Sequence, residues 1–368
     1  MDNILTYLDW RGDITLAERE FNLIDNIILC ELAYIDFVGV VPRLGNNDSA
    51  GITIQDAYEK IKSHSQGIKV TKRSGPLIAY ASLLEKLAAS QRFGGAWLSH
   101  FVDIYDESRH IQFAAMCIGL DDNTTYIVFR GTDSTIIGWR ENFAMSFQAI
   151  PAQTEAVRYL EDVMLPDGIY RVGGHSKGGN LAAYAAMMVP DELKDQIIAI
   201  YNNDGPGFSK EILAEDEYNK IRSKIQRIVP QYCVIGLLFE NDTQRHIVKS
   251  RTYGILQHDS MSWAVGKDSI VSAEDLHRRS KPINAAISRW LEGLDTAERK
   301  ALVDHFFDAL GSRGAKYLSD IPRSGIGSFS SVFKALVKME TEAKAASGKL
   351  RKTVRKGIRE SVQGRLKR

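Results

Sequence analysis

Cysteine is scarce in this chain of 368 residues, and its three cysteines, Cys30, Cys117 and Cys233, show no paired spacing. An odd count without a Cys-x-x-Cys or Cys/His pattern excludes a disulfide framework and a zinc site of known spacing. We therefore expect no metal and no cofactor. Unpaired thiols are typical of the reducing cytoplasm, which is the location that we predict.

Long hydrophobic runs are missing as well. No stretch of 18 or more apolar residues occurs, so the sequence predicts no membrane-spanning helix. Residues 1–11 carry acidic side chains where a signal peptide needs basic ones, and they lack its apolar core. With 44% hydrophobic and 25% charged residues, the composition is that of a soluble globular protein with a large core.

Net charge is nearly absent, at +1, but it is unevenly distributed. Residues 344–368 carry ten Lys and Arg and one Glu, so this tail is net +9 and the remaining 343 residues are net −8. Leu350, Val354 and Ile358 recur at helical spacing among the basic residues, which predicts a short basic amphipathic helix. Such a helix suits an anionic membrane surface, here the inner membrane face, better than nucleic acid. The alternative is a solvated terminus.

The most informative stretch is Gly174-His-Ser-Lys-Gly178, which fits the G-x-S-x-G pattern of a nucleophile elbow. Residues 169–173 read as a strand that enters the turn, and residues 180–188 as a helix rich in small residues that leaves it. A serine hydroxyl becomes a nucleophile when a base removes its proton. The pattern therefore predicts Ser176 as a nucleophile, while His175 points away and is interpreted as packing.

The order of predicted strands and helices indicates an α/β fold with a mostly parallel sheet covered on both faces. We expect four segments: a helical preamble over 1–95, an α/β-hydrolase core over 96–265, a C-terminal helical extension over 266–343, and the basic tail. The extension contains two amphipathic helices, at 281–294 and 296–310, and a probable linker at 322–329.

A serine hydrolase of this fold needs a histidine base after the serine in the chain. Four histidines follow Ser176. His258 lies in a loop just beyond the last predicted strand, where the base belongs, so it is the preferred base. The other three are His246, inside that strand, and His277 and His305, on C-terminal helices.

The acid that orients this base is open among three carboxylates. Asp204 ends the strand that follows the elbow helix, and it is preferred, although it also fits an ordinary turn beside Gly-Pro-Gly. Glu240 and Asp242 follow the next strand and are the alternatives. An oxyanion hole needs two N–H donors. We expect one from the backbone of Lys177 and the second from the region of Thr132, in Phe129-Arg-Gly-Thr-Asp133.

Phe129-Arg-Gly-Thr132 followed by Gly-His-Ser-x-Gly-Gly resembles the class 3 lipase branch of the α/β-hydrolases. There the residue matching Thr132 belongs to the oxyanion hole and the elbow serine is the nucleophile. The stretch 3–263 resembles more closely an uncharacterised bacterial family of putative lipases. The further motifs of that family in this chain are Tyr7-Leu-Asp-Trp-Arg-Gly12, Gly138-Trp139, Tyr201-Asn-Asn-Asp-Gly-Pro-Gly-Phe208, Val248-Lys-Ser250 and Gln257-His-Asp259.

One departure from the lipase pattern is clear. Class 3 lipases carry their acid just before an Ile-Val-Pro stretch, where this chain has Arg227. Either the acid has moved, to Asp204 or Glu240, or the triad is impaired. The expected function is a serine hydrolase of carboxylic esters or thioesters, with an acyl or lipid-like substrate. The alternative is a binding or scaffold protein on a hydrolase fold.

Overall fold

The computed structural model describes residues 1–45, 51–63, 69, 77–109, 111–132, 140–141, 144–145, 149–208, 210–233, 235–237, 243–278 and 304. The predicted linker, the amphipathic helices at 281–294 and 296–310, apart from Asp304, and the basic tail lie outside these residues. The four-segment division of the chain stays a prediction.

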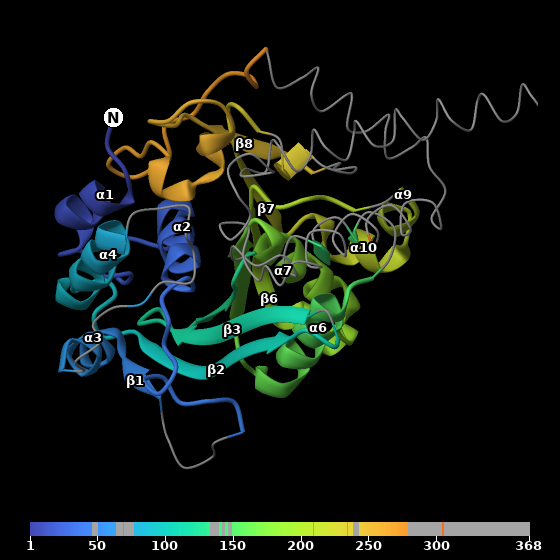
Figure 1. The fold of residues 1–368 in the computed structure, drawn as a ribbon, viewed down its shortest axis with the longest axis horizontal. Coiled ribbons are helices and arrows are strands. Elements are labelled where there is room, and N and C mark those ends of the chain that lie inside the picture. The colour runs from blue at the N-terminus through green and yellow to red at the C-terminus, as the bar shows by residue number, and fades with distance from the viewer. Residues whose placement is uncertain are drawn as a thin grey trace, which may run out of the picture.

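Within the described part of the chain, one sheet of eight strands forms the centre, and its strands follow one another in chain order (Figure 1). The first three pairings are antiparallel and the last four are parallel, so five neighbouring strands, β4 to β8, run in the same direction. The strands are β1 (Ile52–Thr53), β2 (Trp97–Asp106), β3 (Ile111–Gly119), β4 (Thr125–Phe129), β5 (Tyr170–His175), β6 (Ile197–Asn203), β7 (Ile225–Pro230) and β8 (Arg245–Val248).

Helices cover both faces of the sheet. Those before β2 are α1 (Ile4–Arg11), α2 (Leu23–Leu32), α3 (Ile54–Ser63) and α4 (Leu77–Ala89). Those that connect the parallel strands are α6 (Pro151–Val163), α7 (Lys177–Met188), α8 (Asp191–Gln196), α9 (Lys210–Leu213) and α10 (Asp216–Arg222). Three short 3₁₀ helices follow β7 and β8: η1 (Ile235–Leu237), η2 (Gly254–His258) and η3 (Ser260–Ser262).

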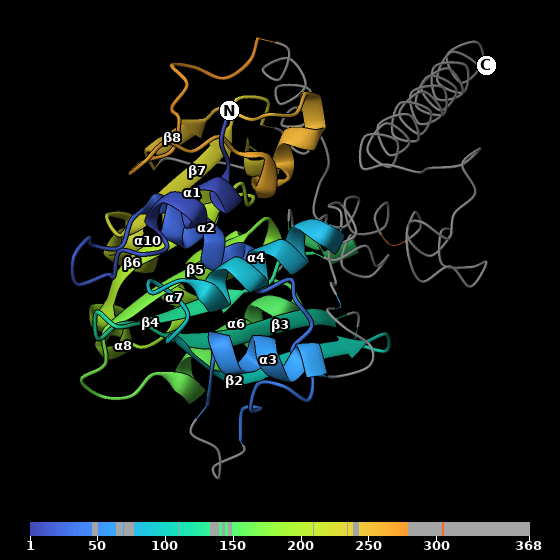
Figure 2. The ribbon, with the colours of Figure 1, turned by 90° about the vertical axis from the view of Figure 1, so that its left-hand side faces the viewer.

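The strand order explains which helices lie on which face. Crossovers between parallel strands are right-handed, and because this sheet never reverses its order, every crossover helix falls on the same side. Accordingly α6, α7 and α10 share one apolar core with Ile127 and Phe129. The neighbouring residues Tyr126 and Val128 point to the other face, where they join a second core with α1 to α4. The N-terminal helices therefore cover a sheet face that the crossovers leave bare, as Figures 1 and 2 show.

The arrangement is that of an α/β-hydrolase, as predicted, with three local differences. The sheet begins with antiparallel strands, and the expected strand at 195–201 is instead the end of α8 followed by β6. The helix after the elbow starts at Lys177, directly after Ser176, rather than at residue 180. Among the described residues, we find no helix whose length and hydropathy would let it cross a lipid bilayer.

Candidate active site

Ser176 occupies the sharp turn between β5 and α7. Its backbone has φ 58° and ψ −128°, a region that non-glycine residues rarely adopt. The turn is crowded, because a Cβ on Gly174 would lie 2.3 Å from the Gly178 carbonyl carbon and one on Gly178 would lie 2.1 Å from the Phe129 oxygen. Only glycine fits at these two positions, and the strained turn between them holds the serine at the carboxyl end of β5.

His258 contacts Ser176 and Asp204 at once. Its Nε2 lies 3.0 Å from the Ser176 Oγ, and its Nδ1 lies 2.7 Å from the Asp204 Oδ2. With Nδ1–H donating to the carboxylate, Nε2 is left to accept the serine proton, which is the tautomer that a general base needs. Three residues separated by up to 82 positions are thus brought into one hydrogen-bonded row.

Asp204 is held on both of its oxygens. While Oδ2 faces His258, Oδ1 accepts hydrogen bonds from the Cys233 thiol at 2.9 Å and from the Gly236 N–H at 3.1 Å. The carboxylate is 1% exposed, and its backbone, like that of Ser176, has a positive φ, here 50°. Burial and the nearby Asp204 raise the pKa of the Cys233 thiol well above its usual value, so the thiol stays protonated and donates.

Arg227 stands on β7, at the position where the lipase pattern predicts an acid. The side chain is 2% exposed, and its Nη2 donates to the Gly236 carbonyl at 2.6 Å. Because the Gly236 N–H in turn holds Asp204, Arg227 supports the turn that contacts the carboxylate. Burial lowers the pKa of Arg227. The acid beside the histidine therefore comes from the end of β6, one strand before β7, where the class 3 lipase pattern would place it.

The loop after β4 packs directly on the elbow. A Cβ on Gly131 would lie 2.4 Å from the His175 carbonyl oxygen and 3.3 Å from the Ser176 Cβ, so the backbone here approaches as closely as glycine allows. Thr132, the next residue, is half-buried beside it. Lys177 is the first residue of α7, and the first N–H groups of a helix have no intrahelical acceptor. Both expected sources of oxyanion donors thus border Ser176.

The side chain of Lys177 has a separate place, which the sequence did not indicate. It is fully buried, and its Nζ donates to Glu141 Oε2 at 2.7 Å and to the Gln112 carbonyl at 2.6 Å. Burial raises the pKa of Glu141, whereas the Lys177 ammonium opposes that rise. This buried ion pair ties the first turn of α7 to β3 and to the segment that contains Glu141.

The interpretation of His175 as packing needs correction. The ring is 1% exposed, but both of its nitrogens are hydrogen-bonded: Nδ1 lies 3.0 Å from the Tyr34 Oη and Nε2 lies 2.7 Å from the His258 carbonyl oxygen. Only Nε2–H can donate to that carbonyl, so Nδ1 accepts from the tyrosine hydroxyl. His175 therefore links the turn after α2 to the segment that carries His258.

Glu240, Asp242 and His305 fall outside the described residues. His277 packs near Tyr232, with ring centroids 5.8 Å apart. Within the described part of the chain, no group of His, Cys, Asp and Glu could hold a metal ion.

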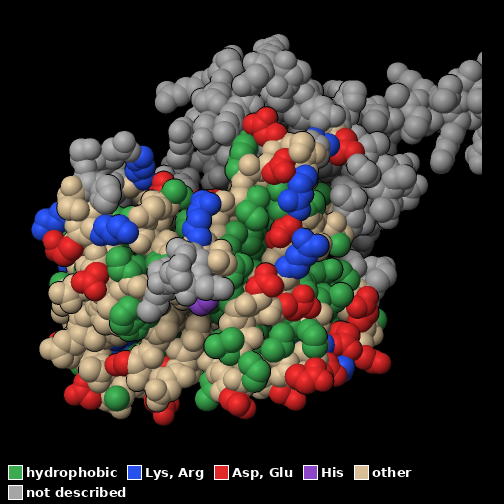
Figure 3. Space-filling model, turned by 90° about the horizontal axis from the view of Figure 1, so that it is seen from below, with side chains coloured by type: hydrophobic (Ala, Val, Ile, Leu, Met, Phe, Trp, Pro, Cys, Tyr) green, Lys and Arg blue, Asp and Glu red, His purple; other side chains and the backbone are tan. Residues whose placement is uncertain are grey.

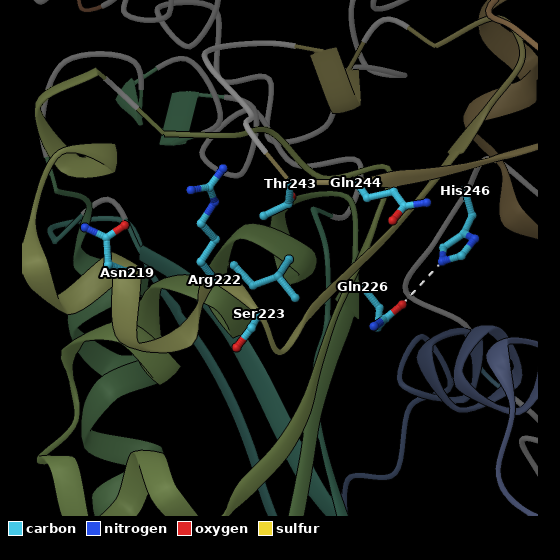
Figure 4. Close-up of a pocket in the computed structure, with 8 residues that line it drawn as sticks. Asn219, Arg222, Ser223, Gln226, Thr243, Gln244 and His246 are labelled. Atoms are coloured by element: carbon cyan, nitrogen blue, oxygen red, sulfur yellow. Dashed lines mark hydrogen bonds between the residues drawn. The ribbon is translucent and has the colours of Figure 1, made fainter.

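His246 borders a hollow of about 490 Å³ on the surface (Figure 4). Its Nε2 lies 3.3 Å from the Gln226 Oε1, and the hollow is also lined by Arg222 and Asn219 of α10. Gln226 and His246 stand near the start of β7 and β8, whereas Ser176, Asp204 and His258 follow the ends of their strands. This hollow therefore lies at the opposite edge of the sheet.

Solved structures that are similar to this chain include two lipases. One is a fungal lipase–inhibitor complex described as a model for interfacial activation, with 18% identity, a TM-score of 0.30, and coverage of 40% of this chain and 66% of the lipase. The other is M37 lipase, with 12% identity, a TM-score of 0.35, and coverage of 73% of this chain and 80% of that one. The matched part of this chain thus spans less than two thirds of the length of the fungal lipase.

No curated protein matches the chain. The model of the Mbeg1-like family matches residues 87–308, a span that includes the elbow, Asp204 and His258. Since this match extends over more than half of the sequence, the chain belongs to the Mbeg1-like family.

Proposed function

We propose that this protein is a serine hydrolase that cleaves carboxylic esters or thioesters. The observation that supports it most directly is the position of His258, within hydrogen-bonding distance of both the Ser176 hydroxyl and the Asp204 carboxylate. A nucleophile in contact with a base, and a base in contact with an orienting group, is the arrangement that activates serine.

The reaction follows from the roles of these groups. Ser176 Oγ attacks the acyl carbon as its proton moves to His258 Nε2, and the Lys177 N–H and the Thr132 region stabilise the oxyanion. The intermediate then expels the alcohol or thiol, which takes the proton from His258, and leaves an acyl-serine. Water, activated by His258, hydrolyses this ester, releases the acid and restores the serine. Asp204 stabilises the imidazolium in both steps.

The test is covalent labelling by a fluorophosphonate probe together with hydrolysis of short p-nitrophenyl esters. We expect labelling of the wild type and none of Ser176→Ala or His258→Ala, with ester turnover lowered about 10⁴-fold or more in each. Circular dichroism and thermal melting serve as the folding control. Retained turnover in Ser176→Ala would exclude the mechanism, and a folded wild type that neither labels nor turns over any ester would favour a binding role.

The proposed location is the cytoplasm, with attachment of the basic tail at 344–368 to an anionic membrane surface. The rest of the chain is net −8. Figure 3, which views the molecule from below, shows acidic side chains gathered toward the lower right. Anionic lipid would repel such a surface, so attachment would depend on the tail. Vesicles rich in anionic lipid should sediment the full chain but not a chain lacking 344–368. Equal sedimentation of the two would exclude attachment by the tail.

A further inference from the structure

A row of polar side chains runs along the buried helix α2 and the turn after it. Asn26, Cys30 and Tyr34 recur at every fourth position, so they lie on one face, and Glu31 lies beside them. All four are at most 1% exposed. Polar groups are costly to bury unless they find hydrogen-bond partners. Their partners lie in the segments that carry Ser176, Asp204 and His258.

The first contact reaches the residue before Asp204. Asn26 and Asn203 exchange amide hydrogen bonds, with the Asn26 Nδ2 donating at 3.0 Å and the Asn203 Nδ2 at 3.1 Å. Tyr126 supports Asn26 by donating to its Oδ1 at 2.7 Å. The Asn203 carbonyl in turn accepts the Ser176 N–H at 2.9 Å. One amide pair thus fixes the end of β6 and, through it, the backbone of the serine.

The second contact reaches the residue before Ser176. The Tyr34 hydroxyl donates to the His175 Nδ1 at 3.0 Å, and the His175 Nε2–H donates to the His258 carbonyl at 2.7 Å. The rings of His175 and His258 also lie 4.7 Å apart. Tyr34 thereby selects the His175 tautomer that can hold the backbone of His258.

The third contact lies just beyond His258. The Ser260 hydroxyl donates to the Glu31 Oε1, and the Tyr80 hydroxyl donates to Oε2 at 2.7 Å. Glu31 therefore accepts on both oxygens and fixes η3, which begins two residues after His258. Each of the three segments is held by a neighbour of its reactive residue rather than by that residue itself.

We propose that α2 and Tyr34 position the whole triad, with Asn26, Glu31 and Tyr34 acting as positioning residues. The inference rests on the proposed function, because it gives these contacts a catalytic purpose. Because α2 and the turn directly after it form one buried unit that holds three segments, the relative distances of these segments stay constant. A displacement of about 1 Å lowers a rate by about 100-fold.

Another face of α2 provides a control for the substitution of Tyr34. Asp25 is also buried, but it faces Arg92, whose Nε donates at 2.8 Å, and Tyr7, whose hydroxyl lies at 3.2 Å. The Tyr7 hydroxyl accepts from Asn22 as well, at 2.9 Å. Tyr7 and Tyr34 are 2% and 1% exposed, so removal of either hydroxyl disturbs a comparable buried site. Only Tyr34 is linked to the triad segments.

The experiment compares Tyr34→Phe with Tyr7→Phe in the full chain on a short p-nitrophenyl ester. We expect kcat to fall about 10- to 100-fold in Tyr34→Phe with KM within about twofold of wild type, because alignment is lost while the binding surface is unchanged. Tyr7→Phe should lower the melting temperature to a similar degree and leave kcat within about twofold. Equal losses of kcat in the two variants would indicate general destabilisation and overturn the inference.

Two variants of His175 sharpen the test. Glutamine places an N–H donor near the position of Nε2, whereas asparagine places one near Nδ1. We therefore expect His175→Gln to keep most of the wild-type kcat and His175→Asn to lose about as much as Tyr34→Phe. The opposite order would contradict the proposed link from His175 to the His258 carbonyl.

A readout that does not depend on turnover separates this inference from the proposed function. The proton between His258 Nδ1 and Asp204 should give a low-field proton NMR signal, assigned by its absence in His258→Gln. We expect Tyr34→Phe to shift or broaden it and Tyr7→Phe to leave it unchanged. If the wild type hydrolyses no ester, the proposed function fails and this signal alone decides the role of α2. An unchanged signal in Tyr34→Phe, with wild-type kcat in an active protein, overturns the inference and leaves the hydrolase proposal intact.

Discussion

Helices α2 and α7 lie on opposite faces of the sheet and are both almost entirely buried, yet their compositions differ. Beyond Asn180, every buried position of α7 is apolar: Leu181, Ala182, Ala183, Ala185, Ala186 and Met187. The buried positions of α2 instead include Asp25, Asn26 and Glu31. Two helices with similar burial therefore differ in the polarity of the side chains that they bury.

The difference reflects what each helix does at the carboxyl edge of the sheet. Small apolar residues let α7 approach the strands closely, as a crossover helix must. Its polar contacts are confined to its first turn, where Lys177 and Asn180 meet the edge. Helix α2, together with Tyr34 in the turn after it, contacts three chain segments at this edge, and directional hydrogen bonds fix their positions more closely than apolar contact would. Burial alone does not show whether a side chain only packs in the core or also positions a reactive residue. Substitutions on the two helices are needed to tell these roles apart.

The largest contrast should come from two buried carboxylates. Asp204→Asn should lower kcat by about 10⁴-fold, since the amide no longer holds the required His258 tautomer. Asp25→Asn weakens the buried pair with Arg92 and should lower the free energy of unfolding by about 3–5 kcal/mol, with kcat of the folded protein unchanged. Ester kinetics and urea denaturation measure the two effects. A large loss of kcat in Asp25→Asn would remove the distinction between the two sides of α2.

The second prediction concerns the first turn of α7. Lys177→Met leaves Glu141 buried without its cation and should cost about 3–5 kcal/mol of stability. The backbone N–H at position 177 remains, so kcat of the folded protein should change little. If kcat falls as far as in Asp204→Asn, the side chain has a direct role in the chemistry.

The loss of stability in Lys177→Met should also depend on pH. Burial already raises the pKa of Glu141, and removal of the ammonium raises this pKa further. The folded variant then binds a proton more tightly than the unfolded chain, so its stability decreases as pH rises through the range between the two pKa values. Urea titrations should show less destabilisation at pH 5 than at pH 8. A loss that does not change with pH would mean that Glu141 is not the group left unpaired.

The smallest difference between the two faces of the sheet should be seen in the reactivity of their buried thiols, which we expect to be equally low on both. Burial raises the pKa of Cys30, within α2, and of Cys117, on the α7 face, to about 12. Neither is accessible as a thiolate near neutral pH, so a disulfide reagent should modify both only after unfolding. Colorimetric titration of thiols, with and without urea, tests this. Rapid reaction of a single thiol in the native protein would show that its face opens locally.

Local patterns in the sequence were sufficient for the elbow and for a preference among the residues now seen in contact, although the acid stayed open among three carboxylates. Gly174 and Gly178 identify a crowded turn, and chain order places Asp204 and His258 after later strand ends. The resemblance alone would have placed the acid beside Ile228, and the bottom-up preference for Asp204 agrees with the contact that forms.

Contacts between distant residues were not predictable in this way. Nothing near Tyr34 indicates that its partner is His175, 141 residues away, or that Glu31 meets Ser260. The polar residues at 26, 30 and 34, which are spaced four apart, are a signal that the prediction of a helical preamble did not use. The buried side chain of Lys177 was also missed, because an exposed lysine is the normal expectation.

The chain order of the sheet has a consequence for how the protein is made. Neighbouring strands are consecutive, so the sheet can extend strand by strand as the chain emerges during synthesis. Helix α2 is present early, but the Glu31 carboxylate waits for Ser260, which is made 229 residues later. Contacts this distant in sequence slow folding. A nascent chain that ends before residue 258 would therefore hold an assembled sheet but lack the Ser260 hydroxyl that contacts Glu31 and the His258 carbonyl that contacts His175, and the site would close as the last step of folding.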